Sequence, residues 1–312
     1  MKKILASIVC CLGMCTVFAD NHEVVTVEQI NEIFGWNFDE VEITTEKVAD
    51  GLYVLFGAGG NIAASVGEQG VLIVDDMFPE LIPKIEKAIN DVGGGSIDFA
   101  INTHWHFDHA HGNLALGPAG THIVAHENSV QMNRVDSIVN IVRYKIAQDA
   151  YPPEAQPVIS FDRSMRFHFN GGVIDLIHAG PAHTAGDTAV IFRQQNAVHF
   201  GDVFNNTGYP FIDADSGGTI NGMVEFCNAI LSELNDESIV IPGHGPVTDV
   251  DDLTAYINML TVVRDRVQAL IEEGQSKDQI LAAKVTSDFD EEYGPEENSL
   301  GFVDRVYTSL MN

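Results

Sequence analysis

Cysteine is scarce in this chain and unevenly placed. Of the four cysteines among 312 residues, Cys10, Cys11 and Cys15 stand near the start, and Cys227 is alone in the remainder. Once the first residues are removed, an intrachain disulfide is therefore excluded. Cys227 lies in "TINGMVEFCNAILSEL", where apolar residues recur at helical spacing, so we predict a core thiol in a helix over residues 219–235.

Basic residues are also few. The chain has 16 Lys and Arg against 45 Asp and Glu, a formal net charge of −29. This excess of negative charge argues against nucleic acid or an anionic lipid surface as a partner. A small-molecule substrate is the partner that we expect, and the sequence does not indicate an oligomeric state.

Long apolar runs are absent except at the start. Lys2 and Lys3 precede "ILASIVCCLGMCTVFA", which is too short to span a bilayer comfortably, and the small residues Val17 and Ala19 precede Asp20. This pattern predicts a secretory signal peptide over residues 1–19, with an amino-terminal anchor as the alternative. We therefore expect a periplasmic or secreted protein that has no membrane attachment after cleavage.

The remaining chain, residues 20–312, has no internal repeat and no linker long enough to divide it. Strand and helix patterns alternate along it, with hairpins between, which predicts an α/β protein with helices over the outer faces of its sheets. We predict a long helix over residues 127–150, because Met132, Val135, Val139, Val142 and Ile146 form an apolar stripe at helical spacing. That helix would be part of the core or a lid over the site.

The stretch "THWHFDHAHGN" follows the predicted strand "IDFAIN" and is rich in groups that bind metals. Residues two apart in an extended segment point the same way, so His104 and His106 can face one metal ion together. Asp108 and His109 follow where the chain turns, and can face a second ion. Four such ligands within six residues are a specific signal, whereas a single H-x-H pair would be weak.

Three further polar residues stand at the ends of predicted strands, each flanked by Gly or Pro: His183 in "GPAHTAGD", Asp202 in "HFGD" and His244 in "PGHGP". His183 can complete the first metal site and His244 the second, and the two oxygens of Asp202 can bridge both. Imidazole with limited carboxylate is the ligand set that zinc prefers. We therefore predict two Zn²⁺ ions per chain, each keeping an open position that a bridging water can fill.

At these residues the sequence resembles the metallo-β-lactamase fold superfamily. The H-x-H-x-D-H motif of the family and its later His, Asp and His ligands match at His104, His106, Asp108, His109, His183, Asp202 and His244. Asp75, after the strand "VLIVD", resembles the acidic residue that precedes the motif. The resemblance covers roughly residues 45–250. It implies a four-layer αββα sandwich with the metals at one edge of the sheets, extended by C-terminal helices over residues 251–312.

The resemblance implies a hydrolase in which a metal-bridging hydroxide, oriented by Asp108 as catalytic residue, attacks an amide, ester, lactone or thioester carbonyl. Asp202 is similar to the bridging carboxylate of the glyoxalase II-like and lactonase-like branch, whereas β-lactamases commonly carry another residue there. A β-lactamase remains an alternative, as does a metal-binding relay protein without turnover, and the ligands alone leave a single-iron oxygenase open. His126 and Tyr209 are candidate substrate contacts, or else ordinary packing residues.

Overall fold

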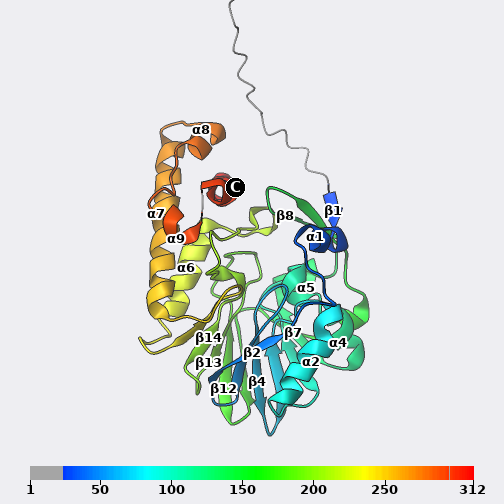
Figure 1. Ribbon diagram of the computed structural model, residues 1–312. Helices are drawn as coiled ribbons and strands as arrows, with labels where there is room; N and C mark the ends of the chain where they lie inside the picture. The colour runs from blue at the N-terminus through cyan, green and yellow to red at the C-terminus, as the bar shows by residue number, and fades with distance from the viewer. Residues whose placement is uncertain (1–23, 295) are drawn as a thin grey trace, which may run out of the picture.

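The computed structural model describes residues 24–294 and 296–312 (Figure 1). The predicted signal peptide, residues 1–19, and its cleavage site lie outside the described residues. Among the helices of the described part, none is both long enough and apolar enough to cross a membrane.

Two sheets form the centre of the molecule. The larger has the strand order β10-β7-β6-β5-β4-β3-β2. Its strands are β2 (Thr44–Ala49), β3 (Leu52–Phe56), β4 (Ile62–Gly67), β5 (Gly70–Val74), β6 (Ile97–Ile101), β7 (His122–His126) and β10 (Ile159–Phe161). The smaller has the order β11-β12-β13-β14-β15. Its strands are β11 (Ser164–Phe169), β12 (Gly172–Ile177), β13 (Ala189–Phe192), β14 (Ala197–His199) and β15 (Ile239–Ile241).

The two sheets face each other across an apolar core. On β5, Leu72 and Val74 belong to a buried cluster that also contains Leu176 and Val190 of the smaller sheet. The alternate β5 residues, among them Ile73, point away from that core and pack in a second cluster with the helices that cover the larger sheet. This alternation is expected for a strand that is buried on both faces.

Helices cover both outer faces and complete four layers, which confirms the predicted αββα sandwich (Figure 1). The α-helices are α1 (Val27–Ile33), α2 (Ile82–Asp91), α3 (Phe107–Ala110), α4 (Asn113–Ala119), α5 (Glu127–Met132), α6 (Ile220–Leu231), α7 (Val250–Glu272), α8 (Lys277–Ala282), α9 (Asp290–Tyr293) and α10 (Glu296–Met311). Short 3₁₀ turns are η1 (Pro79–Leu81), η2 (Pro153–Ala155), η3 (Gly201–Val203) and η4 (Ala214–Ser216). Cys227, on α6, is a buried free thiol, as predicted.

The predicted helix over residues 127–150 is wrong. Only α5 is helical there, and the chain then forms the hairpin of β8 (Ser137–Asn140) and β9 (Lys145–Gln148), which pairs with β1 (Val24–Thr26) in a small third sheet. Val139 and Ile146, two members of the supposed helical stripe, are instead cross-strand partners. The segment is rich in β-branched residues, and the distant strand β1 offers a pairing edge that helical periodicity cannot reveal.

Asn61, in the loop before β4, joins the two sheets at one rim of the sandwich. Its backbone N–H donates to Gly243 O over 2.7 Å. Its side-chain amide donates to Pro242 O and Gly245 O at 3.0 and 2.7 Å. Because residues 242–245 follow β15, these bonds fix the end of the smaller sheet against the larger one. The candidate site lies at this rim.

Candidate metal centre

The seven predicted ligands come from both sheets. His104, His106, Asp108 and His109 follow β6, and the last two lie in the short helix α3. His183 follows β12, Asp202 lies in η3 directly after β14, and His244 follows β15. The chain leaves each of these strands at the same rim, so residues more than 100 positions apart in the sequence meet there.

The structure brings all seven together in three overlapping groups, in each of which the ligand atoms lie within 4.8 Å of one another. The groups are His104–His106–His183, His104–His109–Asp202 and Asp108–His109–His244. The first and third are the two ligand sets that the sequence predicted. The second joins them through His104, His109 and Asp202.

In the first group, one nitrogen of each imidazole ring is hydrogen-bonded to a neighbouring oxygen. Nδ1 of His104 lies 3.0 Å from Thr103 Oγ1, and Nδ1 of His183 lies 2.8 Å from Phe211 O. Nε2 of His106 lies 3.0 Å from Asp213 Oδ2. Each partner accepts an N–H, which leaves the lone pair of the other ring nitrogen free to bind a cation.

Those free nitrogens converge. His183 Nε2 and His106 Nδ1 are 3.0 Å apart, and His104 Nε2 is buried without a hydrogen-bond partner. A buried nitrogen with no partner is costly in a metal-free protein, because its lone pair has lost water and gained nothing. A metal ion bound by the three nitrogens would satisfy all of them, so this donor set fits zinc.

The third group, Asp108–His109–His244, is more acidic than the first. His109 Nδ1 lies 2.7 Å from Asp75 Oδ2, while its Nε2 lies 3.1 Å from His244 Nε2. Asp108 Oδ2 is 3.2 Å from the same His244 nitrogen. Burial alone would lower the pKa of His244, but the carboxylates of Asp202 and Asp108 raise it to about 10. This half of the site therefore attracts positive charge strongly, which a bound cation can supply.

Asp202 lies between the first group and the third. Its Oδ1 is 3.0 Å from His109 Nε2 and 3.4 Å from His244 Nε2, and its Oδ2 is 3.7 Å from His183 Nε2. One oxygen thus faces each group. This is the arrangement that a shared carboxylate requires.

Two glycines allow the ligands to pack so closely against the backbone. A Cβ at Gly60 would lie 2.2 Å from the His109 ring, and a Cβ at Gly243 would lie 2.1 Å from Asp202 Oδ1. Any larger residue at either position would displace a ligand, because real Cβ contacts are not this short.

The residues that hold the ligands were only partly foreseen. Asp75 was identified in the sequence, and it accepts hydrogen bonds from Thr103 as well as facing His109. Thr103 and Asp213 were missed. Asp213 stands in the loop "NNTGYPFIDADSGG", 107 residues from its partner His106, and no spacing rule connects them.

The two predicted substrate contacts lie outside the three ligand groups. His126 Nε2 donates to Asp162 O over 2.6 Å, and its Nδ1 accepts from Asn128 N at the start of α5. The Tyr209 hydroxyl donates to Asp290 Oδ1 over 2.7 Å, and its ring stacks on Phe302 in the C-terminal region. These contacts hold loops together. A direct role of His126 or Tyr209 in substrate binding stays a prediction.

His126 and His178 are expected to make the stability of the protein depend on pH. The His126 ring stacks on that of His178 at 3.8 Å, and His178 Nδ1 donates to Asp187 O. Burial lowers the pKa of both imidazoles below the ordinary value of 6.5, so below that pH the unfolded chain binds more protons. We expect the free energy of unfolding to fall as the pH drops below about 6.5, with a smaller fall in His178→Gln. Urea unfolding at pH 7.5 and pH 5 measures the fall in the free energy of unfolding. An equal fall in the wild type and in His178→Gln would show that the His126–His178 pair is not its cause.

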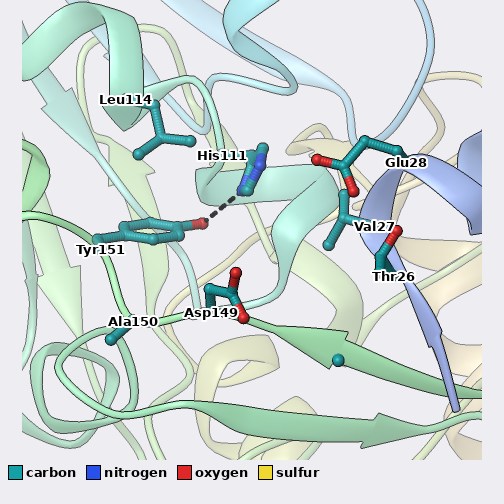
Figure 2. Close-up of a pocket in the computed structure, with 9 residues that line it drawn as sticks. Thr26, Val27, Glu28, His111, Leu114, Asp149, Ala150 and Tyr151 are labelled. Carbon is teal, nitrogen blue, oxygen red and sulfur yellow. Dashed lines mark hydrogen bonds between the residues drawn. The ribbon is translucent and has the colours of Figure 1, made fainter.

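A cavity of about 230 Å³ lies beside the motif and is lined by none of the seven ligands. Figure 2 shows His111 at its centre, hydrogen-bonded to the Tyr151 hydroxyl at 3.2 Å, with the carboxylates of Glu28 and Asp149 nearby. The cavity is bounded by the start of α1 and by the segment after β9. The β8–β9 hairpin that replaces the predicted long helix thus forms one of its walls.

Comparison with known proteins agrees with this geometry. The model of the Metallo-beta-lactamase superfamily matches residues 53–259. The lactamase-like protein aptB of Emericella nidulans is 26% identical over 207 residues, which are 65% of this chain and 56% of that protein. The chain therefore spans little more than half the length of this curated relative.

Solved structures share the fold at low identity. The DIM-1 metallo-beta-lactamase superposes with a TM-score of 0.57 at 17% identity, over 71% of this chain and 99% of its own. The sec-alkylsulfatase Pisa1 from Pseudomonas sp. superposes with a TM-score of 0.64 at 14% identity, over 86% of this chain and 50% of its own. At such identities the likeness concerns the fold alone.

Proposed function

The chain belongs to the metallo-beta-lactamase superfamily, and from this premise we propose that it is a dinuclear zinc hydrolase that cleaves an amide, ester, lactone or thioester bond. The observation that carries the proposal is the position of Asp202, whose two oxygens face separate groups of imidazoles. A shared carboxylate is needed only where two ions lie side by side. Within the superfamily, the position of Asp202 therefore favours a hydrolase in which an aspartate bridges two metal ions.

Zinc ions at these groups would supply a water ionised near neutral pH and a positive charge that polarises a carbonyl. The protein's own residues contribute position. Thr103, Asp75 and Asp213 hold the imidazoles of the ligands in one orientation and one tautomer. Such preorganisation means that little rearrangement is needed when the substrate reacts.

The exposed side of the centre supports a proposal for where the substrate enters. The side chains of Asp108, Asp202 and His244 are 15%, 14% and 23% exposed, whereas that of His109 is fully buried. We propose that substrate approaches over these three side chains, where the Asp108 carboxylate can orient the attacking water. The His104–His106–His183 group is buried and so has little contact with bulk water.

Metal analysis and a substrate panel test the proposal together. We expect about two zinc ions per chain, and zinc-dependent turnover of a chromogenic lactam, lactone or thioester that chelation abolishes. His244→Ala should lose zinc and turnover, whereas His122→Ala, which removes an exposed strand histidine, should keep both. Turnover of lactams alone would favour the β-lactamase alternative. Zinc without any turnover would favour a relay protein, and one iron without zinc would favour an oxygenase.

We also propose that the protein is exported and cleaved after Ala19, on the basis of the apolar segment and small residues at its start. Expression of the full chain in a bacterium should place it in the periplasm or medium, with Asp20 as the first residue by amino-terminal sequencing. An intact Met1 on cytoplasmic protein would contradict this proposal.

A further inference from the structure

The C-terminal helix α10 contacts the η4 turn beside the metal centre, although it lies outside the residues that match the superfamily. Figure 1 shows this helix, in red, above the rim of the sandwich. Arg305 of α10 is nearly buried, with 8% of its side chain exposed. Its guanidinium binds Asp304 Oδ1 of the same helix and, through Nη1, Asp215 Oδ2 at 3.1 Å.

Asp215 is in η4, and two further contacts fix this turn. Asn140 of β8 donates to the same Asp215 oxygen over 2.8 Å. Asn312, directly after α10, donates to Ala214 O over 3.1 Å. The turn is therefore held both by the C-terminal helix and by the β8–β9 hairpin.

Asp213 begins this turn and contacts two ligands of one metal group. Its Oδ1 accepts from Ser216 N, which fixes the carboxylate to η4. Its Oδ2 lies 3.0 Å from His106 Nε2, and both side chains are almost fully buried. Its backbone N–H donates to His183 O over 2.9 Å. The same residue therefore orients the His106 ring and positions the backbone of His183.

We propose that Arg305 is a positioning residue for the metal centre, acting through Asp215 and the η4 turn on Asp213, which orients His106. The proposal rests on the proposed metal site, and it assigns to the C-terminal helix a role in metal binding in addition to packing. A small displacement of η4 would move the Asp213 carboxylate away from His106 Nε2. The His106 ring could then rotate, and its Nδ1 would no longer point at the other nitrogens of its group.

The test measures metal binding directly. Zinc affinity is determined by competition with a chromogenic chelator, and the visible absorption spectrum of the Co²⁺-loaded protein reports the ligand geometry. Asp213→Ala should weaken zinc binding by about 10–100-fold, as expected when the partner of a ligating imidazole is removed. Arg305→Gln should weaken it less, by about 3–10-fold, and should shift the Co²⁺ spectrum in the same direction. Arg305→Lys should recover part of the loss.

Arg266→Gln is the matched control, because Arg266 of α7 also pairs with an aspartate, Asp288, but does not contact η4. It should leave zinc affinity and the Co²⁺ spectrum unchanged, even where it lowers the melting temperature. If Arg305→Gln does not fold, Asp215→Asn, at a half-exposed side chain, removes the same ion pair and should reproduce the effect.

The results distinguish failure of the positioning role of Arg305 from failure of the hydrolase proposal. Unchanged zinc affinity and Co²⁺ spectrum in folded Arg305→Gln and Asp215→Asn would overturn the role of α10. Unchanged values in Asp213→Ala would overturn the whole link to His106. If the variants behave as expected but no substrate of the panel is turned over, the hydrolase proposal fails and the positioning role stands. A wild-type protein that binds no zinc overturns both.

Discussion

Asp202→Ala should lower turnover by about a thousandfold while leaving the fold nearly intact. Asp202 is the ligand whose two oxygens face both imidazole groups, so its removal leaves two separate groups with no shared residue. Positioning of a nucleophile and its activation by metals contribute several kcal/mol, and about 4 kcal/mol corresponds to a thousandfold in rate. The side chain lies at the rim and is part of no apolar cluster, so the melting temperature should change little.

The measurement needs turnover, zinc content and melting temperature for the variant and the wild type, with a substrate that the panel identifies. Asp236→Ala, which removes an exposed carboxylate in the turn before β15, controls for the loss of one negative charge. Near-normal turnover of Asp202→Ala with two zinc ions bound would show that Asp202 is not the shared ligand. The site would then be closer to the β-lactamase arrangement.

Asp75→Ala should destabilise the protein by about 3–5 kcal/mol, because it removes a fully buried acceptor of several hydrogen bonds. Thr103 donates to Asp75 through its backbone N–H and its hydroxyl at 2.7 and 2.8 Å, and His109 Nδ1 lies 2.7 Å away. Without the carboxylate, these buried donors have no partner at the position they occupy. The loss should exceed that of most single surface substitutions.

Asp75 also has a φ of 63°, a left-handed conformation that costs a residue with a Cβ about 1 kcal/mol. Asp75→Gly removes the same carboxylate but tolerates this backbone, so it should be less destabilised than Asp75→Ala by about that amount. Denaturant unfolding of the metal-free proteins gives both values. A cost below about 1 kcal/mol for Asp75→Ala would mean that water replaces the carboxylate without loss.

Local patterns predicted an α/β protein with helices outside its sheets and the meeting of the seven ligands, and the resemblance of the motif to the metallo-β-lactamase superfamily implied the four layers. Strand alternation and strand ends are visible in short segments, and His104, His106 and Asp108 stand in one motif directly after a strand. The ligand set also has few alternatives, since histidines and aspartates rarely follow several strand ends by chance.

The hairpin over residues 127–150 and the role of Asp213 were not predicted, because both depend on tertiary contacts. The apolar pattern of residues 127–150 is compatible with a helix and with a hairpin. Pairing with β1, more than 100 residues earlier, favours the hairpin. Asp213 was overlooked for a similar reason. Its carboxylate meets His106 across 107 positions of the sequence, and the η4 turn that it begins carries no recognisable motif.

The division of the ligands between the two halves of the chain bears on how the protein matures. Four of the seven are made early, within residues 104–109, yet they belong to different groups. The first group is completed only by His183 and the other only by His244. During synthesis, then, an ion captured by the early motif would be bound by ligands that the finished protein assigns to separate sites. Correct loading has to wait until the second sheet has been made and has docked, so acquisition of the metals is expected to be among the last steps in the biogenesis of this protein.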